Sequence, residues 1–179
     1  TEWTMRAGAF LLGRKTYEIF AGSWPNSTDP TDEVATALNT RPKFIASQTL
    51  DHLAWNNSHL LTGNVADAVA QLKAQDGDEI QVHGSGDLLQ TLFTHDLVDT
   101  LRIWQFPVVL GTGKRLFGAG AIPRSFRLVE TQLNTTGAVL HVYERVGKLQ
   151  YGEVEVGQET VIFDSESSHH PGDRERETQ

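Results

Sequence analysis

Short apolar runs alternate with helical patterns over the first hundred residues, and this alternation constrains the fold more than any other feature. The three clearest strand segments cover residues 9–12, 43–46 and 79–83, and small or polar turn residues follow each of them. Strands joined through helices run parallel, because a crossover helix returns the chain to the same end of the sheet. The later apolar runs follow one another without a helix. The sequence therefore predicts an α/β fold: a mixed, mostly parallel sheet flanked by helices, with antiparallel C-terminal strands.

Turn and capping residues set the predicted boundaries. Strands are predicted at residues 9–12, 43–46, 59–61, 79–83, 100–109, 126–130, 139–145 and 151–156, and helices at residues 14–20, 31–39, 65–75 and 87–95. Thr31 and Asn64 are the predicted N-caps of the second and third helices, because their side-chain oxygens accept from free helical N–H groups. Gly77 is the predicted stop of the third helix. In such a sheet, ligands bind at the carboxyl ends of the strands.

The 179 residues fit one compact domain, which we expect to cover residues 1–163. No apolar side chain follows Phe163, so residues 164–179 are predicted to form a disordered acidic tail. Residues 151–163 carry enough apolar side chains to dock on the rest of the protein, and an open sheet edge is one place for them.

Charge and composition exclude several classes of protein. The net charge of −8 is opposite to the basic surface of a nucleic-acid-binding protein. Without cysteine, the chain has no disulfide, thiolate metal site or cysteine nucleophile, and its seven histidines show no metal-ligand spacing. No apolar run approaches the roughly 18 residues of a membrane span, and no signal peptide is visible. We therefore expect a cytoplasmic protein with no metal, no nucleic acid and no membrane segment.

The turn Gly13-Arg14-Lys15-Thr16, between the first strand and the first helix, is the first candidate for chemistry. The free N–H groups and the positive dipole end of a helix suit a phosphate. The dipole alone disfavours two cations at this position, so a bound anion would explain them. Ordinary solvation of Arg14 and Lys15 is the alternative.

A second glycine-rich turn, Gly84-Ser85-Gly86-Asp87-Leu88, also joins a strand to a helix. Glycines let the backbone approach a ligand closely, and the helical N–H groups would face a diphosphate. Leu89 occupies the third glycine position of a G-x-G-x-x-G motif, so an ordinary tight turn remains the alternative. Asp87 is interpreted as an N-cap or first-turn acid. His83 is interpreted as a satisfied strand residue rather than a catalyst.

Two further segments place polar groups after strands. Ser47 and Gln48 follow the strand at residues 43–46, where a hydroxyl holds either a ribose or phosphate, or the turn itself. The segment at residues 107–117 is a glycine-rich loop that contains Lys114 and Arg115. These two cations meet either an anionic substrate or solvent, and solvent is favoured.

Taken in order, five stretches resemble one known family. They are L-G-R-K-T-Y-E at 12–18, I-A-S at 45–47, V-H-G-S-G at 82–86, L-V-D-T-L-R at 97–102 and P-V-V-L-G-T-G-K-R-L-F at 107–117. Over about residues 6–152 the chain is similar to the dihydrofolate-reductase-like superfamily, and most of all to its branch of riboflavin-biosynthesis reductase C-terminal domains. The last stretch is the most specific of the five.

The resemblance implies a sheet that binds NADPH and the transfer of hydride to a C=N or C=O bond of a pterin, pyrimidine or similar small heterocycle. It also implies a homodimer through the C-terminal antiparallel strands. By matching positions, it assigns the cofactor phosphates to Gly13, Arg14, Lys15 and Thr16, the adenosine ribose to Ser47 with Gln48, and the diphosphate to Gly84, Ser85, Gly86, Asp87 and Leu88.

Two departures from the family's pattern bear on function. Relatives tend to have an arginine for the 2′-phosphate at the position of Gln48, so NADH remains possible beside NADPH. Relatives also have a first strand, a loop and a helix before the strand that matches residues 9–12, and eight residues precede Ala9 here. We therefore expect the chain to lack the family's first strand. No catalytic residue is assigned, and Glu18 and Trp24 are the nearest candidates for a proton donor.

Two classes of function remain open. The first is an NAD(P)H-dependent reductase, in which the protein contributes positioning and electrostatics. The second is a non-catalytic nucleotide-binding or oligomerising member of the same fold. A Rossmann-type dehydrogenase is disfavoured, because its glycine-rich turn would lie near the N-terminus with an acidic residue about 20 positions later.

Overall fold

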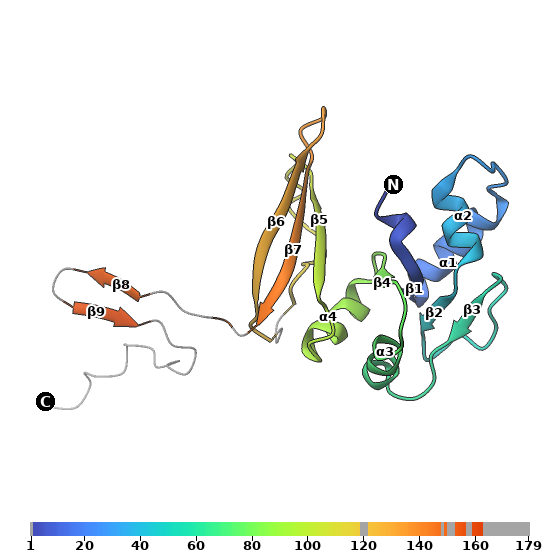
Figure 1. Ribbon diagram of the computed structural model, residues 1–179, viewed down its shortest axis with the longest axis horizontal. Coiled ribbons are helices and arrows are strands. Elements are labelled where there is room, and N and C mark those ends of the chain that lie inside the picture. The colour runs from blue at the N-terminus through green and yellow to red at the C-terminus, as the bar shows by residue number, and fades with distance from the viewer. Residues whose placement is uncertain (1, 119–121, 148, 150–152, 157–158, 163–179) are drawn as a thin grey trace, which may run out of the picture.

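The computed structural model describes residues 2–118, 122–147, 149, 153–156 and 159–162. The first half of the chain forms a parallel sheet of four strands, in the order β3-β2-β1-β4, together with the helices between them (Figure 1). Its strands are β1 (Ala7–Gly13), β2 (Lys43–Ala46), β3 (Ser58–Leu60) and β4 (Glu79–Val82). Because β1 pairs in parallel with both β2 and β4, the carboxyl ends of these three strands lie at one edge of the sheet.

Helices cover both faces of this sheet. They are α1 (Arg14–Ser23), α2 (Glu33–Thr40), α3 (Val65–Lys73) and α4 (Gly86–Thr94), with 3₁₀ turns at Thr4–Arg6 and Trp24–Asn26. Successive side chains of a strand point to opposite faces. Phe10 and Leu12 accordingly pack in one core with residues of α1 and α2, whereas Leu11 packs in a second core with residues of α3 and α4. Burial on both faces explains why β1 is apolar throughout.

The N-cap of α2 is Asp32, and the prediction of Thr31 is wrong. Oδ1 of Asp32 accepts a hydrogen bond from the N–H of Ala35 at 2.9 Å. Thr31 is held in the preceding turn, because its N–H and its hydroxyl both donate to Oδ1 of Asp29. With its own hydroxyl engaged there, Thr31 leaves the capping position to the carboxylate that follows it.

Other predicted boundaries agree more closely. β2 covers the predicted residues 43–46. Asn64 caps α3 as predicted, with its Oδ1 accepting from the N–H of Ala66 at 2.9 Å. The helix ends at Lys73, short of the predicted stop at Gly77.

The C-terminal strands form a separate antiparallel sheet in the order β5-β7-β6, with β5 at Thr100–Gln105, β6 at Ser125–Leu133 and β7 at Val139–Gly147. The predicted strand at residues 100–109 is too long. Pro107 has no N–H to donate, and the N–H of Val108 closes a tight turn on the carbonyl of Phe106 at 2.8 Å. The predicted fold class is confirmed, because helices flank a parallel sheet and the C-terminal strands are antiparallel.

A cleft separates the two sheets. β4 and β5 are the end strands of their sheets, and a volume of about 780 Å³ lies between them. Apolar side chains such as Leu11, Ile80 and Leu101 line the cleft. β4 and β5 belong to different sheets and do not pair through their backbones. An ion pair joins them instead, between Arg102 of β5 and Glu79 of β4 at 3.0 Å.

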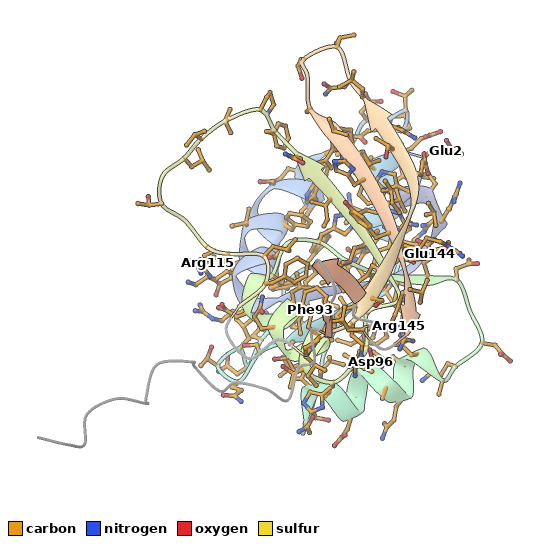
Figure 2. The ribbon with its side chains drawn as sticks, turned by 90° about the vertical axis from the view of Figure 1, so that its left-hand side faces the viewer. Glu2, Phe93, Asp96, Arg115, Glu144 and Arg145 are labelled. Carbon is orange, nitrogen blue, oxygen red and sulfur yellow. The ribbon has the colours of Figure 1, made fainter. Side chains whose placement is uncertain are left out.

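Ion pairs also join the antiparallel sheet to the loop after α4. Arg145 of β7 bonds to Asp96 at 2.8 Å and to Asp99 at 3.0 Å. Arg124 bonds to the same Asp96 at 2.9 Å. Figure 2 shows Arg145 and Asp96 next to one another near Phe93 of α4.

A third pair of strands, β8 (Glu153–Val156) and β9 (Glu159–Ile162), forms an antiparallel hairpin. β8 agrees with the described part of the strand predicted at residues 151–156. Neither strand pairs with the other sheets, so the hairpin does not occupy a sheet edge. The tail predicted at residues 164–179 lies outside the described residues. No helix in the described part of the chain is both long and apolar enough for a bilayer crossing.

Candidate functional site

The carboxyl ends of β1, β2 and β4 surround one cavity of about 550 Å³, as expected for neighbouring parallel strands. Its lining residues are Gly13, Arg14, Lys15, Thr16, Ala46, Ser47, Gln48, Thr49, Val65, Ser85, Gly86, Asp87, Leu88, Thr91 and Lys114. Every residue predicted to bind the cofactor is therefore at this cavity except Gly84, which lines the cleft between β4 and β5. Their role in binding stays a prediction.

Ser85 ties the two glycine-containing turns together. Its Oγ accepts a hydrogen bond from the N–H of Gly13 at 2.8 Å and lies 2.9 Å from Oγ1 of Thr16. Ser85 has a φ of 63°, in the left-handed region, so the strand-to-helix turn is sharp. The two turns are held as one unit although they are 72 residues apart.

Both turns need glycine for a physical reason. A Cβ at Gly13 would lie 3.1 Å from Oγ of Ser85, which is closer than an ordinary contact. Gly84 has a φ of 58°, a conformation that residues with a side chain adopt at a cost. Glycine at these two positions therefore lets the turn after β1 and the turn after β4 pack closely against each other.

Positive charge gathers at the beginning of α1. The first turn of this helix contains Arg14 and Lys15 and no acidic residue. Arg14 bonds to Glu18 at 2.9 Å, one helical turn later, in an exposed pair that contributes little to stability. Among the described residues, Lys15 has no ion-pair partner. The cations and the free N–H groups of the helix together favour an anion at this end of the cavity.

Ser47 holds its own turn. Its Oγ accepts hydrogen bonds from the N–H groups of Thr49 at 3.2 Å and Leu50 at 3.0 Å. This is the turn-forming alternative weighed from the sequence. Gln48, the next residue, lines the cavity.

His83 is packed among aromatic rings at the end of β4. Its ring stacks on Trp3 at 5.6 Å between centroids and meets the edge of Phe10 at 5.5 Å. Burial lowers the pKa of His83 below its usual value of 6.5. His83 is the residue after β4, its ring contacts are those of a packed side chain, and its structural rather than catalytic role stays a prediction.

The two residues named as nearest candidates for a proton donor do not line the cavity. Glu18 is engaged with Arg14. The indole of Trp24 packs edge-to-face on Phe20 at 6.1 Å. The catalytic residue therefore stays unassigned, and no cluster of metal-ligating side chains occurs within the described residues.

The structure adds Lys114 to the site. Lys114 comes from the loop between β5 and β6 and lines the same cavity as Arg14 and Lys15. Its side chain is 72% exposed, in agreement with the solvent exposure that the sequence analysis favoured.

Comparison with known proteins identifies the same family that the five sequence stretches resemble. A family model, the RibD C-terminal domain, matches residues 2–141. The uncharacterized protein YyaP of Bacillus subtilis (strain 168) is 28% identical over 145 residues, which are 80% of this chain and 77% of that protein.

Solved structures share the fold. A putative riboflavin biosynthesis protein from Shewanella sp. PV-4 gives a TM-score of 0.65 at 24% identity, over 81% of this chain and 78% of that one. A pyrimidine reductase-like protein from Corynebacterium diphtheriae gives 0.52 at 12% identity, over 79% and 78%. RibD of Acinetobacter baumannii gives 0.55 at 13% identity, over 81% and 49%. Because the family model matches most of its length, the chain belongs to the RibD C-terminal domain family.

Proposed function

We propose that the chain is a cytoplasmic NAD(P)H-dependent reductase that transfers hydride to a C=N or C=O bond of a pterin, pyrimidine or similar small heterocycle. Membership in the RibD C-terminal domain family supports a reductase. The observation that carries the proposal is the meeting of three strand-end turns, two of them glycine-containing, around one cavity of about 550 Å³. Cavities of roughly 300–1,000 Å³ are typical of cofactor sites.

The residues present fit the phosphates of a dinucleotide. Gly13 and Gly86 line the cavity without side chains, and the helices α1 and α4 begin there. Arg14 and Lys15 supply positive charge beside them. When bound, a nicotinamide cofactor supplies the hydride. The chain's own contribution is to hold the phosphates at these turns and so to fix the position of the cofactor.

NADPH is the cofactor that we propose first, with NADH as the alternative. Gln48 at the end of β2 has no charge to pair with a 2′-phosphate. Discrimination between the two cofactors then depends on Arg14 and Lys15. Both side chains line the cavity, Arg14 in an exposed pair with Glu18 and Lys15 without an ion-pair partner among the described residues.

Calorimetric titration of the chain with NADPH tests the proposal. We expect saturable binding that Arg14→Ala weakens several-fold, because an exposed cation near a phosphate contributes on the order of 1 kcal/mol. Arg127→Ala is the matched control, since Arg127 pairs with Glu144 on the antiparallel sheet. Absence of binding at millimolar NADPH and NADH would overturn the proposal.

Turnover separates the reductase from the alternative function. Loss of NADPH absorbance is followed with a panel of dihydropterins and aminopyrimidine derivatives. Consumption that depends on one heterocycle supports the reductase. Tight cofactor binding without consumption on any member of the panel would instead favour a non-catalytic nucleotide-binding protein.

We also propose that the chain forms a homodimer through the β5-β7-β6 sheet. Large apolar side chains of this sheet and of the loop after β5 are exposed, among them Trp104, Phe106, Val108, Leu128 and Leu133. Surfaces of this kind mark protein interfaces. Light scattering during size exclusion measures the mass: we expect a dimer that a Phe106→Asp and Leu133→Asp double variant converts to a monomer. Ile19→Asp, on an exposed side chain of α1, is the control that leaves the mass unchanged.

A further inference from the structure

The loop between β5 and β6 is anchored to α4. The side chain of Gln90 donates to the carbonyl of Leu116 at 2.8 Å and accepts from the N–H of Gly118 at 2.9 Å. Phe117 packs on Phe93 with ring centroids 5.3 Å apart. A Cβ at Gly118 would lie 2.9 Å from Oε1 of Gln90, so this bidentate contact depends on glycine there. The segment from Leu116 to Gly118 is therefore fixed to the helix.

The anchored loop carries Lys114 to the mouth of the cavity. Its Nζ lies 3.5 Å from Oδ1 of Asp87, and its stem passes over Gly86, where a Cβ would meet Cδ of Lys114 at 3.9 Å. The neighbouring Arg115, labelled in Figure 2, does not line the cavity. Lys114 therefore lines the cavity, whereas Arg115 does not.

The charge of Lys114 is available to a ligand. Both members of its pair with Asp87 are well exposed, and such pairs are worth between 0 and about 1 kcal/mol. Asp87 by itself would repel an anion that enters the cavity. Lys114 neutralises this carboxylate, lies next to the turn at Gly86 and lines the same cavity as Arg14 and Lys15.

We propose that Lys114 binds the diphosphate of the dinucleotide and that Gln90 positions it, which makes the β5–β6 loop a part of the cofactor site. This inference rests on the proposed cofactor-binding function. It assigns Lys114 to the diphosphate, which NADPH and NADH share, and not to the 2′-phosphate.

Calorimetric titration of the full chain with NADPH, NADH, ADP and AMP tests the assignment. Lys114→Ala should raise the dissociation constants of NADPH, NADH and ADP by roughly tenfold, the effect of losing one charge-assisted contact. The change for AMP, which lacks the diphosphate, should be smaller. Arg115→Ala should leave all four constants unchanged, and Lys114→Arg should retain most of the affinity.

The positioning role of Gln90 has its own test. Gln90→Leu releases the loop from α4, so it should weaken NADPH binding only while Lys114 is present. The double variant Gln90→Leu with Lys114→Ala should bind as weakly as Lys114→Ala alone, whereas independent roles would give additive losses.

Three results would overturn the assignment. If the dissociation constants of Lys114→Ala stay within twofold of the wild-type values for every ligand, Lys114 contacts only solvent. A loss for NADPH without a loss for NADH moves its contact to the 2′-phosphate. Wild-type protein that binds none of the four ligands contradicts the proposed function itself, so this failure is distinct from the other two.

Discussion

The N–H of Gly13 donates to Oγ of Ser85 at 2.8 Å, and this bond joins the turn after β1 to the turn after β4. The two turns bound the same cavity. Their spacing is therefore set by one short contact between a glycine and a serine, and changes at either residue act on both turns at once.

Gly13→Ala should lower both stability and NADPH affinity. The new Cβ would lie 3.1 Å from Oγ and 3.2 Å from Cβ of Ser85, so one turn must shift. We expect a loss of about 1–3 kcal/mol in the free energy of unfolding, as for other overpacked positions. Urea unfolding measures the stability, and calorimetry measures the affinity.

Gly22→Ala is the matched control for this prediction. Gly22 lies in α1, and an added Cβ there meets nothing within 4 Å. Alanine should stabilise the helix by about 0.5–1 kcal/mol and leave cofactor binding unchanged. Equal losses from the two substitutions would contradict the role assigned to the Gly13–Ser85 contact.

Because of Lys43, we expect the free energy of unfolding to rise at alkaline pH. This lysine is fully buried in β2, its Nζ donates to the carbonyls of Leu38 and Arg41, and burial lowers its pKa to about 8. Between pH 8 and the ordinary value of 10.5, the unfolded chain holds a proton that the folded chain has released. Stability therefore rises with pH across this window, because the cost of burying the charge disappears.

The comparison of wild type with Lys43→Met isolates this contribution. The difference in unfolding free energy between them should shift in favour of the wild type as the pH rises from 8 to 10. Lys15→Met, at an exposed position of α1, is the surface control for the loss of a lysine. A flat difference for Lys43→Met would mean that the buried amine keeps its ordinary pKa.

His83 is expected to make the stability of the protein depend on pH in the acidic range. Burial among Trp3 and Phe10 lowers its pKa, so the folded chain takes up the proton less readily than the unfolded chain. The stability from a neutral His83 is complete above pH 6.5 and is lost as the pH falls through the range below it. His83→Phe keeps an aromatic ring and should flatten this loss in acid urea unfolding curves. His52→Gln, at an exposed residue, should retain it.

The strand-turn-helix units were predictable because their signals are local. The apolar run of β1 followed by Gly13, and Asn64 before α3, each specify an element from neighbouring residues alone. The residues predicted to bind the cofactor belong to the same units. Parallel strands place their carboxyl ends together, so the turns after β1, β2 and β4 had to meet.

The remaining features depend on contacts between distant segments. The bond from Gly13 to Ser85 spans 72 residues, and Lys114 reaches Asp87 across 27. Neither pair has a spacing that a helix or a turn would reveal. The end of β5 at Gln105 was missed for a different reason: Val108 and Val109 extend an apolar run that Pro107 has already interrupted.

Asp96 and Arg145 should be coupled more strongly than an ordinary surface pair. Asp96 bonds to Arg124 at 2.9 Å and to Arg145 at 2.8 Å, and these guanidinium groups hold the pKa of its carboxyl below 3.8. Asp96→Asn keeps a residue that tolerates its φ of 56° while it removes the charge. We expect a loss on the order of 1 kcal/mol in unfolding free energy at neutral pH.

The coupling itself is measured by a double-mutant cycle of Asp96→Asn with Arg145→Met. Glu144→Gln with Arg127→Met is the matched cycle, because both side chains of that pair are well exposed and they meet at 3.3 Å. The first cycle should give the larger interaction energy and should lose it as the pH falls through the acidic range, where Asp96 takes up a proton. Equal energies in the two cycles would show that the contacts of Asp96 with β7 and Arg124 add no stability beyond that of a solvated pair.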